Sequence, residues 1–398
     1  MDGLEKLTNW FETGQGIRPS AEEPNFVDLV RSLFYLAGVE KVRPDLGAEK
    51  ISRMIGEADH HLFILIDGLG LDQMKILPDS GFLNTHLVRN LQSLFLSTTA
   101  TAMTTLATGK WPCSHGVPGW WMYLAEPDLS VVTLPFVERM SKKPLELFGL
   151  AAEDLFPEPS LWPKVKKKVN PILPAQIAES TYTRYSFGSI RKTGYRDLDE
   201  AMRIAFQVIS NAAKPSLTYL YLPQFDAVVH ENGTGHEKAR ECLMAIDGRI
   251  RELHEKLSGK ARFVISSDHG MIDVPEERKF VLSMDDPLME HLRCVPSGEP
   301  CVPIFYVRPG YEDQFSSYFN ARFGDYFILL RPDQIERMRL LGPHLLSDVM
   351  EKRLGTFMAI AIQSTAIYVS SEDNPAHLHV GYHGGLSRNE MYIPLILA

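Results

Sequence analysis

The stretch HLFILIDGLG at residues 61–70 joins a short apolar run to an aspartate and two glycines. An apolar run of this length, bounded by turn residues, is typical of a strand buried on both faces. Similar runs occur at 93–97 (SLFLS), 216–222 (SLTYLYL) and 261–267 (ARFVISS). Between them, apolar residues recur three or four apart, as in 236–257, which predicts amphipathic helices. The sequence therefore predicts an α/β protein with a mostly parallel central sheet covered by helices on both faces.

The segment 274–365 has a different pattern, because short apolar strands there enclose one amphipathic helix. The candidate elements are strands at 303–307, 325–330 and 357–362 and a helix at 311–323. We expect a small α+β cap-like insertion at 274–365, placed within a catalytic core formed by 1–273 and 366–398. The proline-containing stretch 154–174 is expected to pass over the surface of this core.

Composition and charge exclude several classes of protein. The 398 residues are 44% hydrophobic and carry a net charge of −9, with a pI near 5.8. No basic run is longer than Lys166–Lys168, so a nucleic acid is not expected as a stable partner. No apolar run reaches about 18 residues, and the first 16 residues contain no apolar stretch of signal-peptide length. We therefore expect a cytoplasmic protein that does not span a membrane.

The cysteines do not indicate a metal knuckle or a redox pair. The sequence has four of them and no CxxC spacing. The simplest interpretation is four reduced thiols, with a bond between Cys294 and Cys301 as the alternative in an oxidising compartment.

Polar side chains follow the predicted strands at the points where they end. Because the carboxyl ends of parallel strands meet at one edge of a sheet, these side chains are expected to lie close together. Three aspartates and three histidines in one place would repel or desolvate each other without a cation. Their mixture of oxygen and nitrogen suits zinc, with manganese as the alternative, and seven donors suit two ions better than one. The candidate ligands are Asp67, Asp226, His230, Asp268, His269 and His383, with the hydroxyl of Thr98 or Thr99 as the seventh donor.

The hydroxyl-rich stretch 95–108 has a role beside such a metal pair. A threonine at the start of a helix, next to divalent ions, could attack a phosphoryl group. Ser97, Thr98 and Thr99 are the candidates for this nucleophile. The threonines farther along the helix are expected to bond backbone carbonyls.

As an ordered set these motifs resemble the alkaline phosphatase superfamily, and within it the type I phosphodiesterase and nucleotide pyrophosphatase branch. Each motif alone is common, whereas five in family order are specific. The motifs are IDGLG (66–70), STTATAMTTLATGKWPCSHG (97–116), FDAVVH (225–230), SDHGM (267–271) and YHGG (382–385).

The resemblance implies a role for each motif residue. Thr99, nine residues before Thr108, would be the nucleophile and would form a covalent phospho-threonine intermediate that water then hydrolyses. One metal ion would be held by Asp67, Thr99, Asp268 and His269, and the other by Asp226, His230 and His383.

The sequence departs from the family pattern after the SHG element. The nucleotide pyrophosphatases have an Asn there that holds a phosphate oxygen, and Trp120 occupies that place. The oxyanion donor is therefore unassigned, with the Thr99 backbone N–H, Arg184 and Lys110 as candidates. Trp120 and Trp121 could stack on an aromatic part of the substrate or pack under a loop.

The resemblance implies a hydrolase that acts on a small-molecule phosphoester. Because 95–123 offers only Lys110 to compensate phosphate charge, we expect a diester rather than a monoester. The alternatives are a phosphomonoesterase, a phosphonate hydrolase, and a non-catalytic relative that binds a phosphoryl ligand. The leaving group, the native metal and the oligomeric state have no signal in the sequence.

Overall fold

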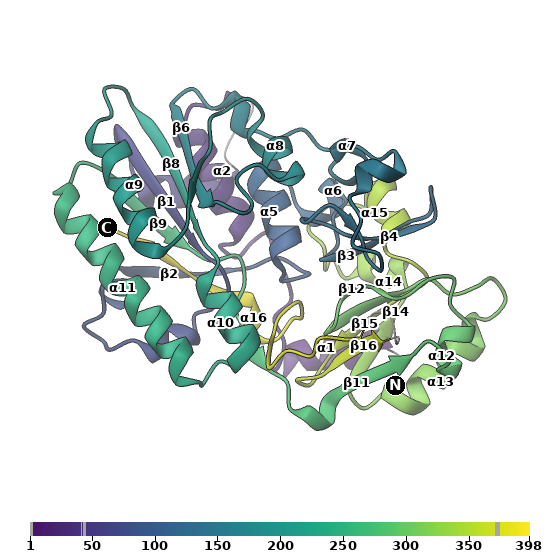
Figure 1. The fold of residues 1–398 in the computed structure, drawn as a ribbon. Helices are drawn as coiled ribbons and strands as arrows, with labels where there is room; N and C mark the ends of the chain where they lie inside the picture. The colour runs from purple at the N-terminus through teal and green to yellow at the C-terminus, as the bar shows by residue number, and fades with distance from the viewer. Residues whose placement is uncertain (1–2, 41, 43–44, 371–374) are drawn as a thin grey trace.

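A seven-stranded sheet forms the centre of the molecule (Figure 1). The computed structural model describes residues 3–40, 42, 45–370 and 375–398. Five neighbouring strands are parallel, whereas β18 runs antiparallel to both its neighbours, so the predicted mostly parallel α/β sheet is confirmed. In spatial order the strands are β2 (Leu87–Gln92), β18 (Tyr392–Leu397), β9 (Arg262–Ser266), β1 (His60–Ile66), β8 (Ser216–Leu222), β6 (Lys168–Pro174) and β7 (Thr193–Tyr195).

Helices cover both faces of this sheet, as predicted. Alternate residues of β1 point to opposite faces, and every residue of the strand is buried. Phe63 and Leu65 join the apolar cluster that includes α2 (Phe26–Leu36) and α5 (Thr99–Thr108). Leu62, Ile64 and Ile66 join the other cluster, with α9 (Leu198–Ser210) and α11 (Glu237–Leu257), on the opposite side in Figure 1. The core therefore lies on both faces of the sheet, and each large aliphatic side chain buried there contributes about 1.5–3 kcal/mol.

The stretch 93–97 is not a strand, which corrects the prediction. β2 ends at Gln92, and the next five residues lead into α5 with a single bridge between Ser97 and Gly384. The backbone N–H of Ser93 instead donates to the carbonyl of Met391. These residues are buried without belonging to a strand. Their apolar composition therefore indicates burial and does not indicate a strand.

The stretch 154–174 also differs from its prediction. It ends in β6, which lies inside the central sheet between β8 and β7 rather than over the surface. Pro171 lies before the pairing with β7 begins at Ile172, so its missing N–H falls where the strand has one neighbour only.

A second sheet, also of seven strands, is antiparallel throughout. Four of its strands come from 274–365, and α13 (Glu312–Phe323) buries three phenylalanines against them. The other three strands come from 121–138, so the sheet extends beyond the predicted insertion, whose domain boundaries stay a prediction. In spatial order the strands are β14 (Phe327–Leu330), β15 (Phe357–Ala361), β13 (Val302–Phe305), β12 (Ser297–Glu299), β3 (Trp121–Leu124), β4 (Leu129–Val132) and β5 (Val137–Glu138).

Two further observations bear on the class of protein. All four cysteines are free thiols. Among the described residues, no helix combines the length and the apolar character that crossing a bilayer requires.

Candidate active site

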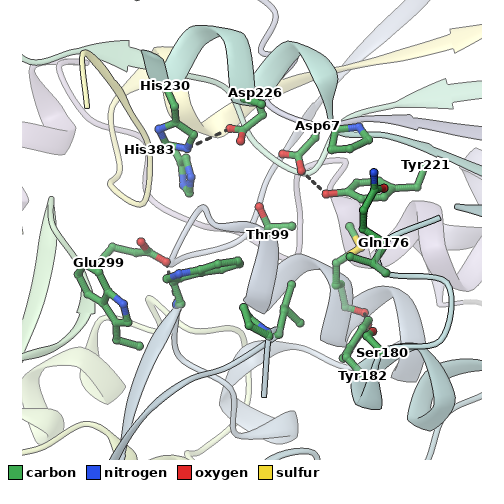
Figure 2. Close-up of a pocket in the computed structure, with 18 of the residues that line it drawn as sticks. Asp67, Thr99, Gln176, Ser180, Tyr182, Tyr221, Asp226, His230, Glu299 and His383 are labelled. Atoms are coloured by element: carbon green, nitrogen blue, oxygen red, sulfur yellow. Dashed lines mark hydrogen bonds and ion pairs between the residues drawn. The ribbon is translucent and has the colours of Figure 1, made fainter. Parts of the chain in front are cut away.

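A cavity of about 840 Å³ opens at the carboxyl ends of the central strands and is also lined by residues of the second sheet. Figure 2 shows Asp67, Asp226, His230 and His383 grouped on one side of it, with Thr99 facing them. Asp67 directly follows β1, and Asp226 and His230 lie on α10 (Gln224–Asn232), which follows β8. Chain segments that are far apart in sequence therefore meet at one sheet edge, as the sequence predicts.

The remaining donors complete two overlapping groups. Ligand atoms of Asp67, Asp268 and His269 lie within 4.8 Å of one another, and so do those of Asp226, His269 and His383. The Nε2 atom of His269 is 3.4 Å from Asp67 Oδ1, and its ring stacks on His383 with 3.8 Å between centroids. His269, which the resemblance assigns to the Asp67 group, thus lies between the two groups.

The three histidines each place Nδ1 next to a backbone carbonyl. The Nδ1 atoms of His230, His269 and His383 lie 2.8, 3.2 and 3.1 Å from the backbone carbonyls of Gly381, Gly270 and Ser97. A carbonyl only accepts hydrogen bonds, so each Nδ1 carries the proton and each Nε2 keeps a lone pair. Burial and the neighbouring histidines hold the pKa of His383 well below its usual range, which keeps this ring neutral. This is the tautomer in which histidine binds a metal.

The three aspartates each have a carboxylate oxygen that is free to bind a cation. Asp67 Oδ1, Asp226 Oδ1 and Asp268 Oδ2 are buried and have no hydrogen-bond partner. Burial and the nearby carboxylates of Asp268 and Asp226 raise the pKa of Asp67 well above its usual range, and burial also raises the pKa of Asp226. Buried carboxylates without partners cost free energy, so the donor set fits two divalent ions of the zinc or manganese type.

Neighbouring groups fix the other carboxylate oxygens. The hydroxyl of Tyr221 donates to Asp67 Oδ2, which Figure 2 marks with a dashed line. Asp268 Oδ1 accepts from the backbone N–H groups of Gly68 and His269, at 3.2 and 3.1 Å. Contacts of this kind orient metal ligands in proteins and strengthen metal binding.

Of the three candidate nucleophiles, the geometry favours Thr99. Ser97 and Thr98 are fully buried and already donate, Ser97 to the carbonyl of Gly385 at 2.8 Å and Thr98 to Glu299 at 2.5 Å. Thr99 begins α5 and lines the cavity, with its Oγ1 3.3 Å from His269 Nε2. Of these three candidates, Thr99 alone therefore presents its hydroxyl to the metal-binding groups.

The threonines farther along α5 bond backbone carbonyls, as predicted. Thr104 and Thr108 each donate to a carbonyl one turn earlier at 2.8 Å, and Thr105 donates to Lys110 at 2.9 Å. The hydrogen-bonding capacity of these buried hydroxyls is therefore satisfied by the backbone.

With this geometry established, comparison with known proteins places the chain. The family model described as type I phosphodiesterase / nucleotide pyrophosphatase matches residues 61–386. The chain belongs to this family. The matched range runs from β1 to just past His383, so the family region contains every candidate metal ligand. No match was found among curated proteins.

Solved structures share the fold at low sequence identity. Murine ectonucleotide pyrophosphatase / phosphodiesterase 5 is 17% identical with a TM-score of 0.62, over 84% of this chain and 87% of that one. An inactive form of the same murine protein, in complex with AMP, gives a TM-score of 0.63 over the same shares, also at 17% identity. Phosphonoacetate hydrolase from Sinorhizobium meliloti 1021, in complex with phosphonoacetate, is 16% identical with a TM-score of 0.61, over 85% of this chain and 89% of that one.

The predicted substrate contacts have different outcomes within this family framework. Trp120 and Trp121 line the cavity. The prediction for Arg184 is wrong: it lies on α8 (Thr181–Phe187) outside the lining and donates instead to the Thr181 hydroxyl at 3.0 Å and to a carbonyl of its own helix end. Lys110 also does not line the cavity, because it forms an ion pair with Glu158 at 2.5 Å.

Several lining residues had no signal in the sequence. Glu299 and Arg139 reach the cavity from the second sheet, and the guanidinium of Arg139 lies 3.9 Å above the ring centroid of Trp121. Long-range strand pairing places them there, and local periodicity does not report such pairing. Apolar side chains beside α5 form another part of the lining: Met103, Leu106, Trp162, Leu173, Phe187 and Tyr219.

Proposed function

We propose that this member of the family is a two-metal phosphodiesterase or nucleotide pyrophosphatase that acts through a covalent phospho-threonine on Thr99. The proposal rests on one observation above all: Thr99 lies beside a group of aspartates, each with a buried carboxylate oxygen that has no hydrogen bond and lies 3.3–3.5 Å from a histidine Nε2. Family membership makes the chain a phosphoester hydrolase. The threonine intermediate and the diester substrate are the finer parts of the proposal.

Seven side chains would hold the two ions. Zinc or manganese, when bound, would supply positive charge to stabilise the phosphoryl oxygens and the threonine alkoxide. The proposed ligands are Asp67, Thr99, Asp268 and His269 for one ion and Asp226, His230 and His383 for the other.

Thr99 would carry the chemistry in two steps. In the first, its Oγ1 forms a bond to phosphorus, its proton is released, and the leaving-group oxygen departs with the bonding electron pair. In the second, a water oxygen bonds to phosphorus and the bond to Oγ1 breaks, which restores the threonine. The first turn of α5 would direct backbone N–H groups at the phosphoryl oxygens, since an anion is favoured at a helix N-terminus.

The cavity favours a diester over a monoester. It extends from Thr99 both toward Trp120 and Trp121 and toward the apolar side chains beside α5, so both substituents of a diester have a place. Among the described lining residues, Arg139 and Lys142 carry positive side chains. Because positive side chains can compensate the additional charge of a monoester or a phosphonate, they favour the second candidate, a phosphonate hydrolase or a phosphomonoesterase. A non-catalytic relative is disfavoured, because clustered carboxylates that serve no reaction would only lower the stability of the fold.

Hydrolysis of model esters tests the proposal. Metal-stripped protein is restored with zinc or manganese and assayed with bis-p-nitrophenyl phosphate, p-nitrophenyl phosphate and phosphonoacetate. Metal-dependent cleavage of the diester, lost in Thr99→Ala, is the expected result. Thr108→Ala is the matched control, because it removes a hydroxyl of the same helix that bonds the Thr104 carbonyl and the Lys110 N–H and contacts no candidate metal ligand. Preference for the monoester or for phosphonoacetate would replace the diesterase by the second candidate.

A small-molecule phosphoester is the proposed partner, and the cytoplasm stays a predicted location.

A further inference from the structure

Glu299 brings a carboxyl group from the second sheet to the start of α5. It ends β12, and its side chain is only 4% exposed. Its Oε1 accepts two hydrogen bonds, from the Thr98 hydroxyl at 2.5 Å and from the Trp120 backbone N–H at 2.8 Å. Glu299 therefore contacts the residue before the proposed nucleophile and the residue at the family's Asn position.

The carboxyl group shares the cavity with the reacting groups. Figure 2 shows it pointing into the space beside Thr99 and below His383. A Cβ atom on Gly384 would lie 2.9 Å from Glu299 Cβ and Cγ, so only glycine permits this approach at a φ of +119°. Gly384 therefore leaves the space that the Glu299 side chain occupies.

No cation pairs with this carboxyl group in the part of the chain that the structure describes. Both of its hydrogen bonds use Oε1, and no lysine or arginine lies within ion-pair distance. Arg139 acts on it only through a longer-range attraction. Burial raises the pKa of Glu299 to about 7. At pH 8.5 the cavity therefore contains a negative charge without a salt-bridge partner.

We propose that Glu299 selects substrates by charge, and that it disfavours dianionic phosphomonoesters relative to monoanionic phosphodiesters. This inference rests on the proposed function. A monoester carries a charge near −2 above pH 7, whereas a diester carries −1. Because Glu299 is buried, its carboxylate is screened less by water and repels the extra charge more strongly than an exposed carboxylate would. The second substituent of a diester has no such charge.

Glu299→Gln is the decisive variant, because glutamine keeps an oxygen that accepts both hydrogen bonds while the charge is removed. We expect the ratio of kcat/KM for p-nitrophenyl phosphate to kcat/KM for bis-p-nitrophenyl phosphate to rise at least about tenfold at pH 8.5. Thr98→Val is the control, since it removes one hydrogen bond and keeps the carboxyl group. Because loss of this donor raises the pKa of Glu299, the control is also assayed at a higher pH, where the carboxyl group is ionised. The ratio for Thr98→Val should stay within about twofold of wild type. An unchanged ratio in Glu299→Gln would overturn the proposal and leave Glu299 a positioning residue.

A second variant covers the case in which Glu299→Gln does not fold. Thr98→Val with Glu299→Met replaces the two side-chain partners of the Thr98–Glu299 hydrogen bond by apolar groups of similar shape, and the Trp120 N–H then loses its acceptor at a cost of about 1–3 kcal/mol. The same rise in the ratio is expected, and its absence counts against the proposal in the same way.

Binding separates this inference from the proposed function. In zinc-loaded Thr99→Ala, the Glu299→Gln change should tighten binding of p-nitrophenyl phosphate at least about tenfold relative to bis-p-nitrophenyl phosphate, measured by calorimetry. If the wild-type protein cleaves neither ester, the proposed function fails while this measurement still decides the role of Glu299. Equal effects on both ligands would overturn charge selection even if both are hydrolysed.

Discussion

Removing the metals should destabilise the protein by an amount that grows with pH. In the metal-free fold, burial and nearby carboxylates raise the pKa of Asp67, and burial raises the pKa of Asp226. In the unfolded chain aspartate titrates near 4. Above this pH the folded state therefore binds more protons than the unfolded state. The stability of the metal-free protein consequently falls as the pH rises from about 4 through the raised values.

The size of the effect follows from linkage and chain length. An ion at a thousandfold excess over its Kd stabilises the folded state by about 4 kcal/mol. Unfolding a chain of 398 residues changes the entropy by about 0.8 kcal/mol/K, at about 2.1 cal/mol/K per residue. Each occupied site should therefore raise Tm by about 5 °C, and both by about 10 °C. Calorimetry of stripped and zinc-restored protein at pH 5 and pH 8 measures this difference, which should be larger at pH 8.

Asp226→Asn tests the reasoning directly. The metal-free variant should unfold at a higher temperature than metal-free wild type at pH 8, because it no longer buries an unpartnered charge. Zinc should then add about 5 °C instead of about 10 °C, because one site has lost a ligand.

Asp247→Asn is the matched control for a buried aspartate away from the metals. Its carboxylate accepts the backbone N–H groups of Phe82 and Leu83 at 3.0 and 2.8 Å. Asparagine keeps one acceptor oxygen, so loss of the other bond and of the ion pair with Arg251 at 3.2 Å should lower Tm by about 1–2 °C with or without zinc. If Asp226→Asn also lowers the Tm of the metal-free protein, or still gains the full zinc stabilisation, the carboxylates do not form the proposed site.

Two further predictions concern the surroundings of the site. Tyr221→Phe removes the hydroxyl that donates to Asp67, and it should weaken zinc binding about 10–100-fold in competition with a chelator while leaving the fold unchanged by circular dichroism. Unchanged zinc affinity would show that this hydroxyl does not orient the ligand. Leu106→Trp should fill the apolar part of the cavity and lower kcat/KM for bis-p-nitrophenyl phosphate at least about tenfold more than for methyl p-nitrophenyl phosphate. Equal losses for both esters would mean that the substituent does not enter that side.

The central sheet and the grouping of the candidate metal donors could be predicted because each depends on local sequence, whereas metal binding by these donors stays a prediction. A buried parallel strand reads as a continuous apolar run, and a donor such as Asp67 follows directly where β1 ends. The topology of parallel sheets then brings the strand ends together without further information. The positions of side chains in space could therefore be predicted where they depend on the position of a residue at the end of one strand.

The second sheet and its contacts could not be predicted in the same way. β3 pairs with β12 across more than a hundred residues of sequence, and this pairing alone carries Glu299 to the cavity. β6 contains a proline that masks its strand character. Arg184 failed for a different reason, since a helix-surface arginine can bond its own helix, and composition does not reveal that choice.

The facing arrangement of the two sheets has a consequence for divergence within the family. Thr99 and the candidate metal donors other than His383 lie in segments that follow strands of the central sheet, and His383 follows β17 (Gly381–Tyr382) of a separate two-stranded sheet. Glu299 and Trp121 belong to the second sheet, and Arg139 directly follows its strand β5. Under the proposed function, mutations in the second sheet would therefore change the lining of the cavity without moving Thr99. Descendants of one ancestral hydrolase could in this way acquire new esters while inheriting the same reaction.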